Sequence, residues 1–245
     1  MELILLSAAC SLNPRPTNAF HCLLKQISLL TFNRNFVSAS QKGDELRNAI
    51  FSVDIGQYDL ANSLGLSHKQ IVDEKIPPAL ASIKNAIKLL YELGARKFVI
   101  YSTGPFGYLP RILDGLRKGD HHLRLDKVGC SVDCNELVRT FNDGLSSLLA
   151  AIRSQMEEAL IVYVVMKSPN FSLIFASRLQ NPLIPFPSQE GSAPTICLDP
   201  SRAVNWDGIH YSEAANSIIA SKIWFGKYAS PYIKFKDLCE MAIKD

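Results

Sequence analysis

The residues with the clearest chemical potential in this chain are Asp207 and His210, which lie three positions apart. A carboxylate at this spacing can accept a hydrogen bond from the imidazole, fix its tautomer and leave the other ring nitrogen free as a base. Gly208 between them permits a tight turn that would strain a residue with a Cβ atom. The pattern is typical of the base and the orienting acid of a hydrolytic triad.

The same residues have a second interpretation, and one member of a triad is missing from the pattern. Taken alone, the same residues also fit an Asp-Gly turn followed by a surface histidine near the start of a helix. The third member of a triad, a nucleophile, is not found. Ser102 ends an apolar run, but its surroundings do not resemble the exposed turn that presents a nucleophilic serine.

A metal site is not expected. The six cysteines lie at positions 10, 22, 130, 134, 197 and 239, and the Cys130-x3-Cys134 pair has no second pair or histidine cluster at ligand spacing. The even count would suit disulfides in a secreted protein, and buried free thiols are an equally good interpretation. The sequence predicts neither a metal nor an organic cofactor.

Composition predicts one globular domain over residues 1–245, with residues 1–45 atypical in pattern. The chain is 47% apolar and 20% charged, enough to bury a core. Its net charge of +3 is scattered rather than gathered in a basic stripe, which argues against nucleic-acid binding. The longest apolar run, residues 159–166, is too short to cross a bilayer. Residues 1–10 form a weak signal peptide at best and fit a buried element equally well.

Strands and helices are predicted to alternate after residue 45. Three apolar runs indicate buried strands at residues 49–53, 97–101 and 159–165. Apolar side chains at spacings of three and four indicate helices at 77–93, 132–157 and 213–225, the last with Ser212 as its N-cap. The weakly periodic segment 168–200 is predicted to be loop. This alternation favours a parallel sheet with helices on both faces.

Three polar segments are expected to meet at one edge of that sheet. Loops at 54–59 and 102–107 follow the first two predicted strands, and the turn at 207–210 could reach the same place. Sites in open parallel sheets form outside the carboxyl ends of the strands. We therefore expect the candidate site there.

Several of these segments resemble a known family. Residues 205–216, with Asn-Trp-Asp-Gly-Ile-His before a helix of small residues, are similar to the last conserved block of plant GDSL esterase/lipases, of the SGNH hydrolase superfamily. Residues 54–60 resemble that family's third block, Gly-x-Asn-Asp, and residues 103–110 resemble its Gly-Pro-Leu-Gly-Cys-Leu-Pro segment. Residues 126–142 fit the helix that follows. The resemblance covers about residues 45–226, in the family's order.

The resemblance implies a three-layer α/β/α sandwich with a parallel sheet, flavodoxin-like in arrangement, in a secreted hydrolase of ester bonds. By this resemblance His210 is the base and Asp207 orients it, while Gly56 and Tyr58 occupy the block that helps to hold the oxyanion. The substrate class would be an acyl or acetyl ester of a lipid or a polysaccharide.

The chain also departs from the family pattern. It contains no Gly-Asp-Ser block, so it fits a truncated or degenerate member whose sheet lacks its first strand. Tyr58 replaces the third-block asparagine and Tyr108 replaces a cysteine, and Cys130 and Cys197 are left without the partners that the family would give them. Loss of a triad nucleophile costs on the order of a million-fold in turnover. The sequence thus predicts a weak or inactive esterase, with a non-catalytic protein that binds a glycan or lipid ester as the alternative.

Overall fold

The computed structural model describes residues 3–7, 46–118, 124–127, 129–166, 204–205 and 208–241 of the 245, with the backbone alone at 3–7 and 117–118. Residues outside these ranges include Asp207 and the predicted loop 168–200. No helix in the described part of the chain is long and apolar enough to span a membrane.

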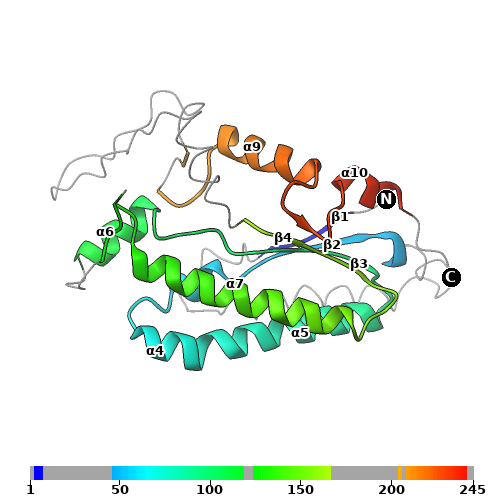
Figure 1. The fold of residues 1–245 in the computed structure, drawn as a ribbon, viewed down its shortest axis with the longest axis horizontal. Helices are drawn as coiled ribbons and strands as arrows, with labels where there is room; N and C mark the ends of the chain where they lie inside the picture. Colours follow the sequence, from blue (N-terminus) through cyan, green and yellow to red (C-terminus); the bar gives the residue numbers. More distant parts are fainter. Residues whose placement is uncertain are drawn as a thin grey trace, which may run out of the picture.

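The centre of the fold is a five-stranded sheet whose strands follow chain order (Figure 1). Four strands are parallel: β1 (Leu3–Ser7), β2 (Ile50–Asp54), β3 (Lys97–Tyr101) and β4 (Leu160–Val164). The short β5 (Ala229–Ser230) pairs antiparallel with β4 at the edge. The predicted parallel sheet is confirmed, and the three predicted strands match β2, β3 and β4 to within one residue. The carboxyl ends of β1 to β4 therefore lie along one edge.

The structure differs from the sequence prediction at the start of the sheet. A strand was not expected before residue 49, yet β1 pairs with β2 over five residues, from Leu3 opposite Ile50 to Ser7 opposite Asp54. The apolar run 3–6 is too short to show a period of its own, and the small residues that follow it made it equally compatible with a leader segment. Pairing with a neighbouring strand, which the sequence alone does not display, identifies it as part of the sheet.

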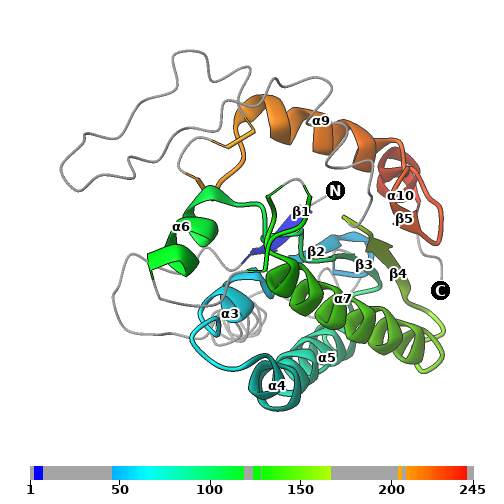
Figure 2. The ribbon, with the colours of Figure 1, turned by 60° about the vertical axis from the view of Figure 1, so that its left-hand side comes forward.

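Helices cover both faces of the sheet, which gives the predicted three layers (Figure 2). On one face α5 (Ile76–Glu92) and α7 (Val132–Arg153) pack against the larger core, to which the strands contribute Phe51, Phe98 and Ile100. On the other face α9 (Glu213–Trp224) and α10 (Phe235–Glu240) lie over the strands, and Leu238 of α10 packs into a smaller core.

Six further elements were not predicted: α3 (Gln57–Ala61), α4 (His68–Gln70), the π-helical turn η1 (Ile71–Lys75), α6 (Pro110–Lys118), β5 and α10. The helical backbone before α5 starts at a capping box between Ser67 and Gln70 rather than at the two prolines. Pro77 and Pro78 have no N–H to donate, so the regular ladder is interrupted there, and the turn just before them is π-helical.

Candidate active site

The loop after β2 begins with a glycine that no other residue can replace without strain. Gly56 is the N-cap of α3 and has a φ of 116°, in the region that favours glycine. A Cβ atom on Gly56 would lie 2.6 Å from Cζ of Phe141 and 3.1 Å from Oγ1 of Thr103. The backbone of this loop therefore lies directly against α7 and the loop after β3. Tyr58, two residues on, has a side chain that is 48% exposed.

Two asparagines on α7 hold the loop that follows β3. The Thr103 N–H donates to Oδ1 of Asn142 at 2.9 Å, and Nδ2 of Asn142 donates to the Thr103 carbonyl at 2.8 Å. Two helical turns earlier, Oδ1 of Asn135 accepts from the Gly107 N–H at 3.0 Å. A Cβ atom on Gly107 would lie 2.5 Å from the Ser131 carbonyl oxygen, so this approach also requires glycine. The helix thus fixes both ends of the loop.

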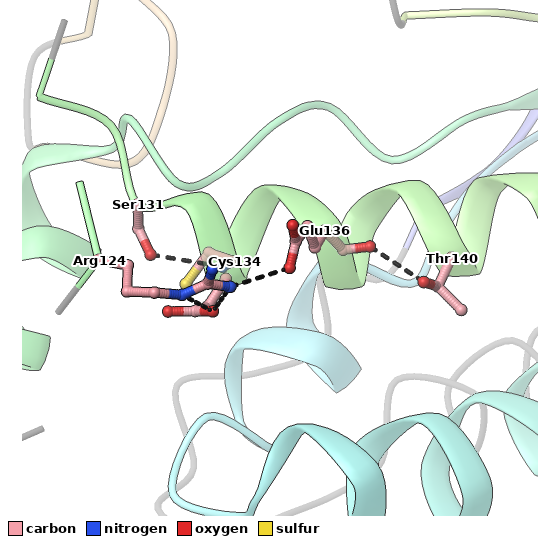
Figure 3. A network of polar contacts seen from close by, with 6 residues as sticks. Arg124, Ser131, Cys134, Glu136 and Thr140 are labelled. Atoms are coloured by element: carbon pink, nitrogen blue, oxygen red, sulfur yellow. Dashed lines mark hydrogen bonds and ion pairs between the residues drawn. The ribbon is translucent and has the colours of Figure 1, made fainter. Parts of the chain in front are cut away.

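The first turn of α7 is itself firmly anchored (Figure 3). Ser131 caps the helix, with its Oγ accepting from the Cys134 N–H at 3.3 Å. The Arg124 guanidinium donates to Asp133 and to Glu136 Oε2, the latter at 3.1 Å. Both carboxylates lie near the N-terminus of the helix, where negative charge is favourable. The N-terminal turn of α7, the helix that positions the loop after β3, is therefore fixed by side-chain hydrogen bonds.

The turn that carries His210 packs against the same loop. Gly208 has a φ of 84°, and its carbonyl accepts from the Arg111 N–H at 3.3 Å. The hydroxyl of Tyr211 lies 2.5 Å from the hydroxyl of Tyr108, a hydrogen bond between side chains 103 residues apart in sequence. His210 lies between these two attachments, and its side chain is exposed.

Electrostatic contacts tie this turn to the end of β2 as well. Burial raises the pKa of Tyr211, and the nearby Asp54 carboxylate raises it further. Burial of its surroundings also raises the pKa of Asp54, although the residue itself is exposed to solvent. Tyr108 has a pKa raised by burial and by Tyr211. The three predicted segments therefore meet at the carboxyl edge of the sheet.

The sequence-predicted site residues are placed as follows. His210 lies on the turn at this edge, Gly56 and Tyr58 lie at the start of α3, and Asp207 lies outside the described residues. Ser102 is 2% exposed, and its Oγ accepts from the Met166 N–H at 2.7 Å. A buried hydroxyl held in this way is a poor nucleophile, in agreement with the sequence interpretation.

The cysteines and acids of the described ranges show no metal centre. Cys130, Cys134 and Cys239 are free thiols, and the remaining three cysteines lie outside the described residues. Among the described residues, no group of three or more histidines, cysteines and acids is arranged to hold a metal ion. Burial raises the pKa values of the Cys130 and Cys134 thiols, which keeps them protonated near neutral pH.

Three features of this site were missed by the sequence analysis. The Tyr108–Tyr211 hydroxyl pair carries no local sequence signal, because its members are far apart in the chain. Thr103 is 3% exposed, and its Oγ1 has no hydrogen-bond partner among the described residues. Ser7 ends β1 opposite Asp54, and so it lies in the backbone register at the same sheet edge.

The fold is a three-layer α/β sandwich, and the histidine turn lies at the carboxyl edge of its parallel sheet. Comparison with known proteins identifies its family. Residues 21–223 match the family described as GDSL-like Lipase/Acylhydrolase. The chain is 36% identical to GDSL esterase/lipase At1g09390 of Arabidopsis thaliana over 211 residues (79% of this chain, 56% of the relative). It is 32% identical to GDSL esterase/lipase LIP-4 of Arabidopsis thaliana (94% and 65%) and to GDSL esterase/lipase ENOD8 of Medicago truncatula (83% and 58%).

The chain therefore belongs to the GDSL-like lipase/acylhydrolase family. It spans between 56% and 65% of the length of these three relatives.

Proposed function

We propose that this protein is a GDSL-type ester hydrolase by descent that retains its base, His210, and has weak or no turnover. The observation that carries the proposal is the double attachment of the histidine turn, through Gly208 to Arg111 and through Tyr211 to Tyr108. Catalysis by a histidine needs its position fixed relative to the reacting atoms. These contacts support such a role for His210, with Asp207 as the residue that orients it.

Weak turnover follows from what the chain lacks. No Gly-Asp-Ser block occurs in the sequence, and removal of a triad nucleophile costs on the order of a million-fold. Tyr58 takes the place of an asparagine that would donate to the oxyanion, and loss of one such donor costs about a hundred- to a thousand-fold. Gly56, with its φ of 116° at the start of α3, supports a retained turn at this block, in which Tyr58 would stand near the oxyanion position.

The substrate class follows from the family. We propose an acyl or acetyl ester of a lipid or of a polysaccharide, met outside the cell. No metal or organic cofactor enters this chemistry, because a serine-type ester hydrolase uses nucleophilic attack, proton transfer and oxyanion stabilisation, all of which protein groups supply. A non-catalytic protein that binds such an ester is the second candidate, and the missing nucleophile block is the observation that favours it.

The test is hydrolysis of p-nitrophenyl acetate by the purified 245-residue chain, beside labelling with a fluorophosphonate probe. Exposed imidazoles hydrolyse this activated ester slowly by themselves, so the comparison is between His210→Ala and a matched variant, His68→Ala. His68 is exposed at the start of α4. We expect a low rate that falls more in His210→Ala than in His68→Ala, and no labelled serine.

Each other outcome changes the assignment. A rate that labels a serine and disappears in His210→Ala would mean that a substitute nucleophile exists, and mapping of the label would show whether it is Ser7. Equal rates for both histidine variants would contradict the role of His210 as a base. Saturable binding of an acylated glycan or lipid by folded protein, without turnover, would establish the non-catalytic alternative.

A further inference from the structure

One surface of the molecule gathers large apolar side chains that are exposed to solvent. Eight such side chains occur among the described residues, and four of them fall within the last 18 positions described. They are Trp224 (47% exposed), Phe225 (61%), Tyr232 (69%) and Met241 (41%). Single exposed apolar residues need no explanation, but a concentration of this kind marks an interaction surface.

The fold brings the aromatic members of this group together. The rings of Trp224 and Phe235 lie 6.0 Å apart between centroids. A Cβ atom on Gly226 would lie 2.3 Å from the Ile233 carbonyl oxygen, so the chain just after Phe225 runs directly against the segment that follows Tyr232. Figures 1 and 2 both show the end of α9 beside α10. The exposed side chains of residues 224–241 thus lie on adjoining segments, and we name this region, with its exposed lysines, the aromatic–lysine surface.

Its charge is positive. Residues 222–241 contain four lysines and two acids, Asp237 and Glu240, a net charge of +2. Lys227, Lys234 and Lys236 are exposed, and Lys236 lies 3.7 Å from Glu240, which leaves Lys227 and Lys234 as the exposed cations nearest to Phe225 and Tyr232 in the chain. Neither acid lies in the segment 222–234 that contains Trp224, Phe225 and Tyr232.

We propose that the aromatic–lysine surface docks on anionic phospholipid bilayers, with the aromatic side chains in the interfacial region and the lysines facing lipid phosphates. Tryptophan and tyrosine favour this region of a bilayer, and adjacent lysines are attracted to its negative surface. Phe225 and Met241 favour a lipid over a glycan because they have no strong hydrogen-bonding atom for sugar hydroxyls. The inference does not rest on the proposed catalytic function.

The geometry keeps this surface apart from the candidate active site. α9 begins one residue after Ser212, close to His210, and Trp224 is its last residue. The eleven residue-to-residue steps from Glu213 to Trp224 correspond to about 17 Å along the helix axis. The aromatic–lysine surface and the histidine turn therefore lie at opposite ends of α9.

The experiment is co-sedimentation of the 245-residue chain with vesicles of phosphatidylcholine alone or with about one-third phosphatidylserine. We expect binding to the serine-containing vesicles that weakens as salt is added. The Lys227→Glu/Lys234→Glu variant should bind at least tenfold more weakly, since each lysine near an anionic surface contributes about fivefold. Phe225→Ser/Tyr232→Ser should lose most binding while keeping the wild-type melting temperature, because both side chains are largely exposed.

The matched control is Lys88→Glu/Leu89→Ser, which makes the same kinds of change at exposed positions of α5, on the opposite face of the sheet. This variant should bind like the wild type. Equal binding to both vesicle types, or equal loss in the control, would overturn the proposal. So would retention of folded protein by polygalacturonate with none by vesicles, or a dimer that Phe225→Ser/Tyr232→Ser converts to monomer.

Discussion

At the scale of single residues, the contact between Tyr108 and Tyr211 links the loop after β3 to the histidine turn. Tyr108→Phe removes one hydroxyl and leaves the other partly buried without this partner. We expect a loss of about 1 to 2 kcal/mol in the free energy of unfolding, the usual cost of such a group. Urea denaturation of the single and double phenylalanine variants measures it.

The double variant separates the energy of the hydrogen bond between the two hydroxyls from the cost of burying each hydroxyl. If the two hydroxyls stabilise each other, Tyr108→Phe/Tyr211→Phe should cost clearly less than the sum of the single variants. Additive costs would show that the two hydroxyls are not coupled and that other contacts, such as the one between Gly208 and Arg111, hold the turn.

Thr103 provides the opposite case, a buried hydroxyl with no hydrogen-bond partner in the part of the chain that the structure describes. Thr103→Val keeps the shape of the side chain and removes an oxygen that is desolvated without a hydrogen bond. We expect the variant to be as stable as the wild type or more stable by up to about 1 kcal/mol. The matched change is Ser102→Ala, which removes the acceptor of the Met166 N–H and should destabilise. A Thr103→Val variant that loses as much as Ser102→Ala would show that Oγ1 does have a partner in solution.

At the scale of elements, α7 positions the loop after β3. Asn142→Leu keeps a similar side-chain volume but leaves the Thr103 N–H and carbonyl without their partners in a buried place. Each orphaned group costs about 1 to 3 kcal/mol, so we expect a loss of roughly 2 to 5 kcal/mol. Chemical denaturation checks it.

Ser147→Ala is the control on the same helix. Ser147 is exposed, and its hydroxyl donates only within the helix, to the Asp143 carbonyl. Its substitution should change stability by less than about 0.5 kcal/mol. If Asn142→Leu were equally mild, the loop would be held by packing rather than by these hydrogen bonds.

The same scale shows what the sequence could and could not predict. Four elements could be predicted from local patterns: continuous apolar runs indicate β2, β3 and β4, and a serine cap followed by a periodic apolar stripe indicates α9. β1 could not be predicted in this way, because its assignment depends on pairing with β2, a contact between residues about 47 positions apart. The π-helical turn η1 depends on hydrogen bonds that the prolines of α5 fail to make, which a hydrophobic pattern cannot reveal.

At the scale of the whole molecule, the carboxyl edge of the sheet was predictable because parallel strands must end together. The segments that meet there were identified from sequence. The side chains that join these segments could not be predicted, because each contact links distant parts of the chain. These contacts are the hydrogen bond between Tyr108 and Tyr211, the hydrogen bonds of Asn142 to Thr103, and the proximity of Asp54 to Tyr211. Only the folded arrangement specifies such pairs.

The buried tyrosines also make a prediction for the stability of the whole molecule in alkali. Burial raises the pKa of Tyr163 to about 12, and the pKa values of Tyr101, Tyr108 and Tyr211 are raised as well. An unfolded tyrosine titrates near pH 10. A group with a raised folded pKa contributes stability that is complete below about pH 10 and is lost as the pH rises toward 12. For Tyr163, which is 5% exposed, this loss amounts to about 2 to 3 kcal/mol.

Tyr163→Phe isolates this effect. The variant gives up the hydrogen bond to the Asn142 carbonyl, so near pH 8 it should be less stable than the wild type by about 1 kcal/mol. Between pH 10 and 12 it has no phenol to ionise, so its deficit should shrink and then reverse. Lys97, whose pKa is lowered by burial, has the opposite dependence in both proteins and cancels in the comparison. Guanidinium denaturation at a series of pH values measures the difference in stability, with Tyr232→Phe as the exposed control. A deficit for Tyr163→Phe that stays constant up to pH 12 would mean that Tyr163 ionises as easily in the folded protein as in the unfolded chain.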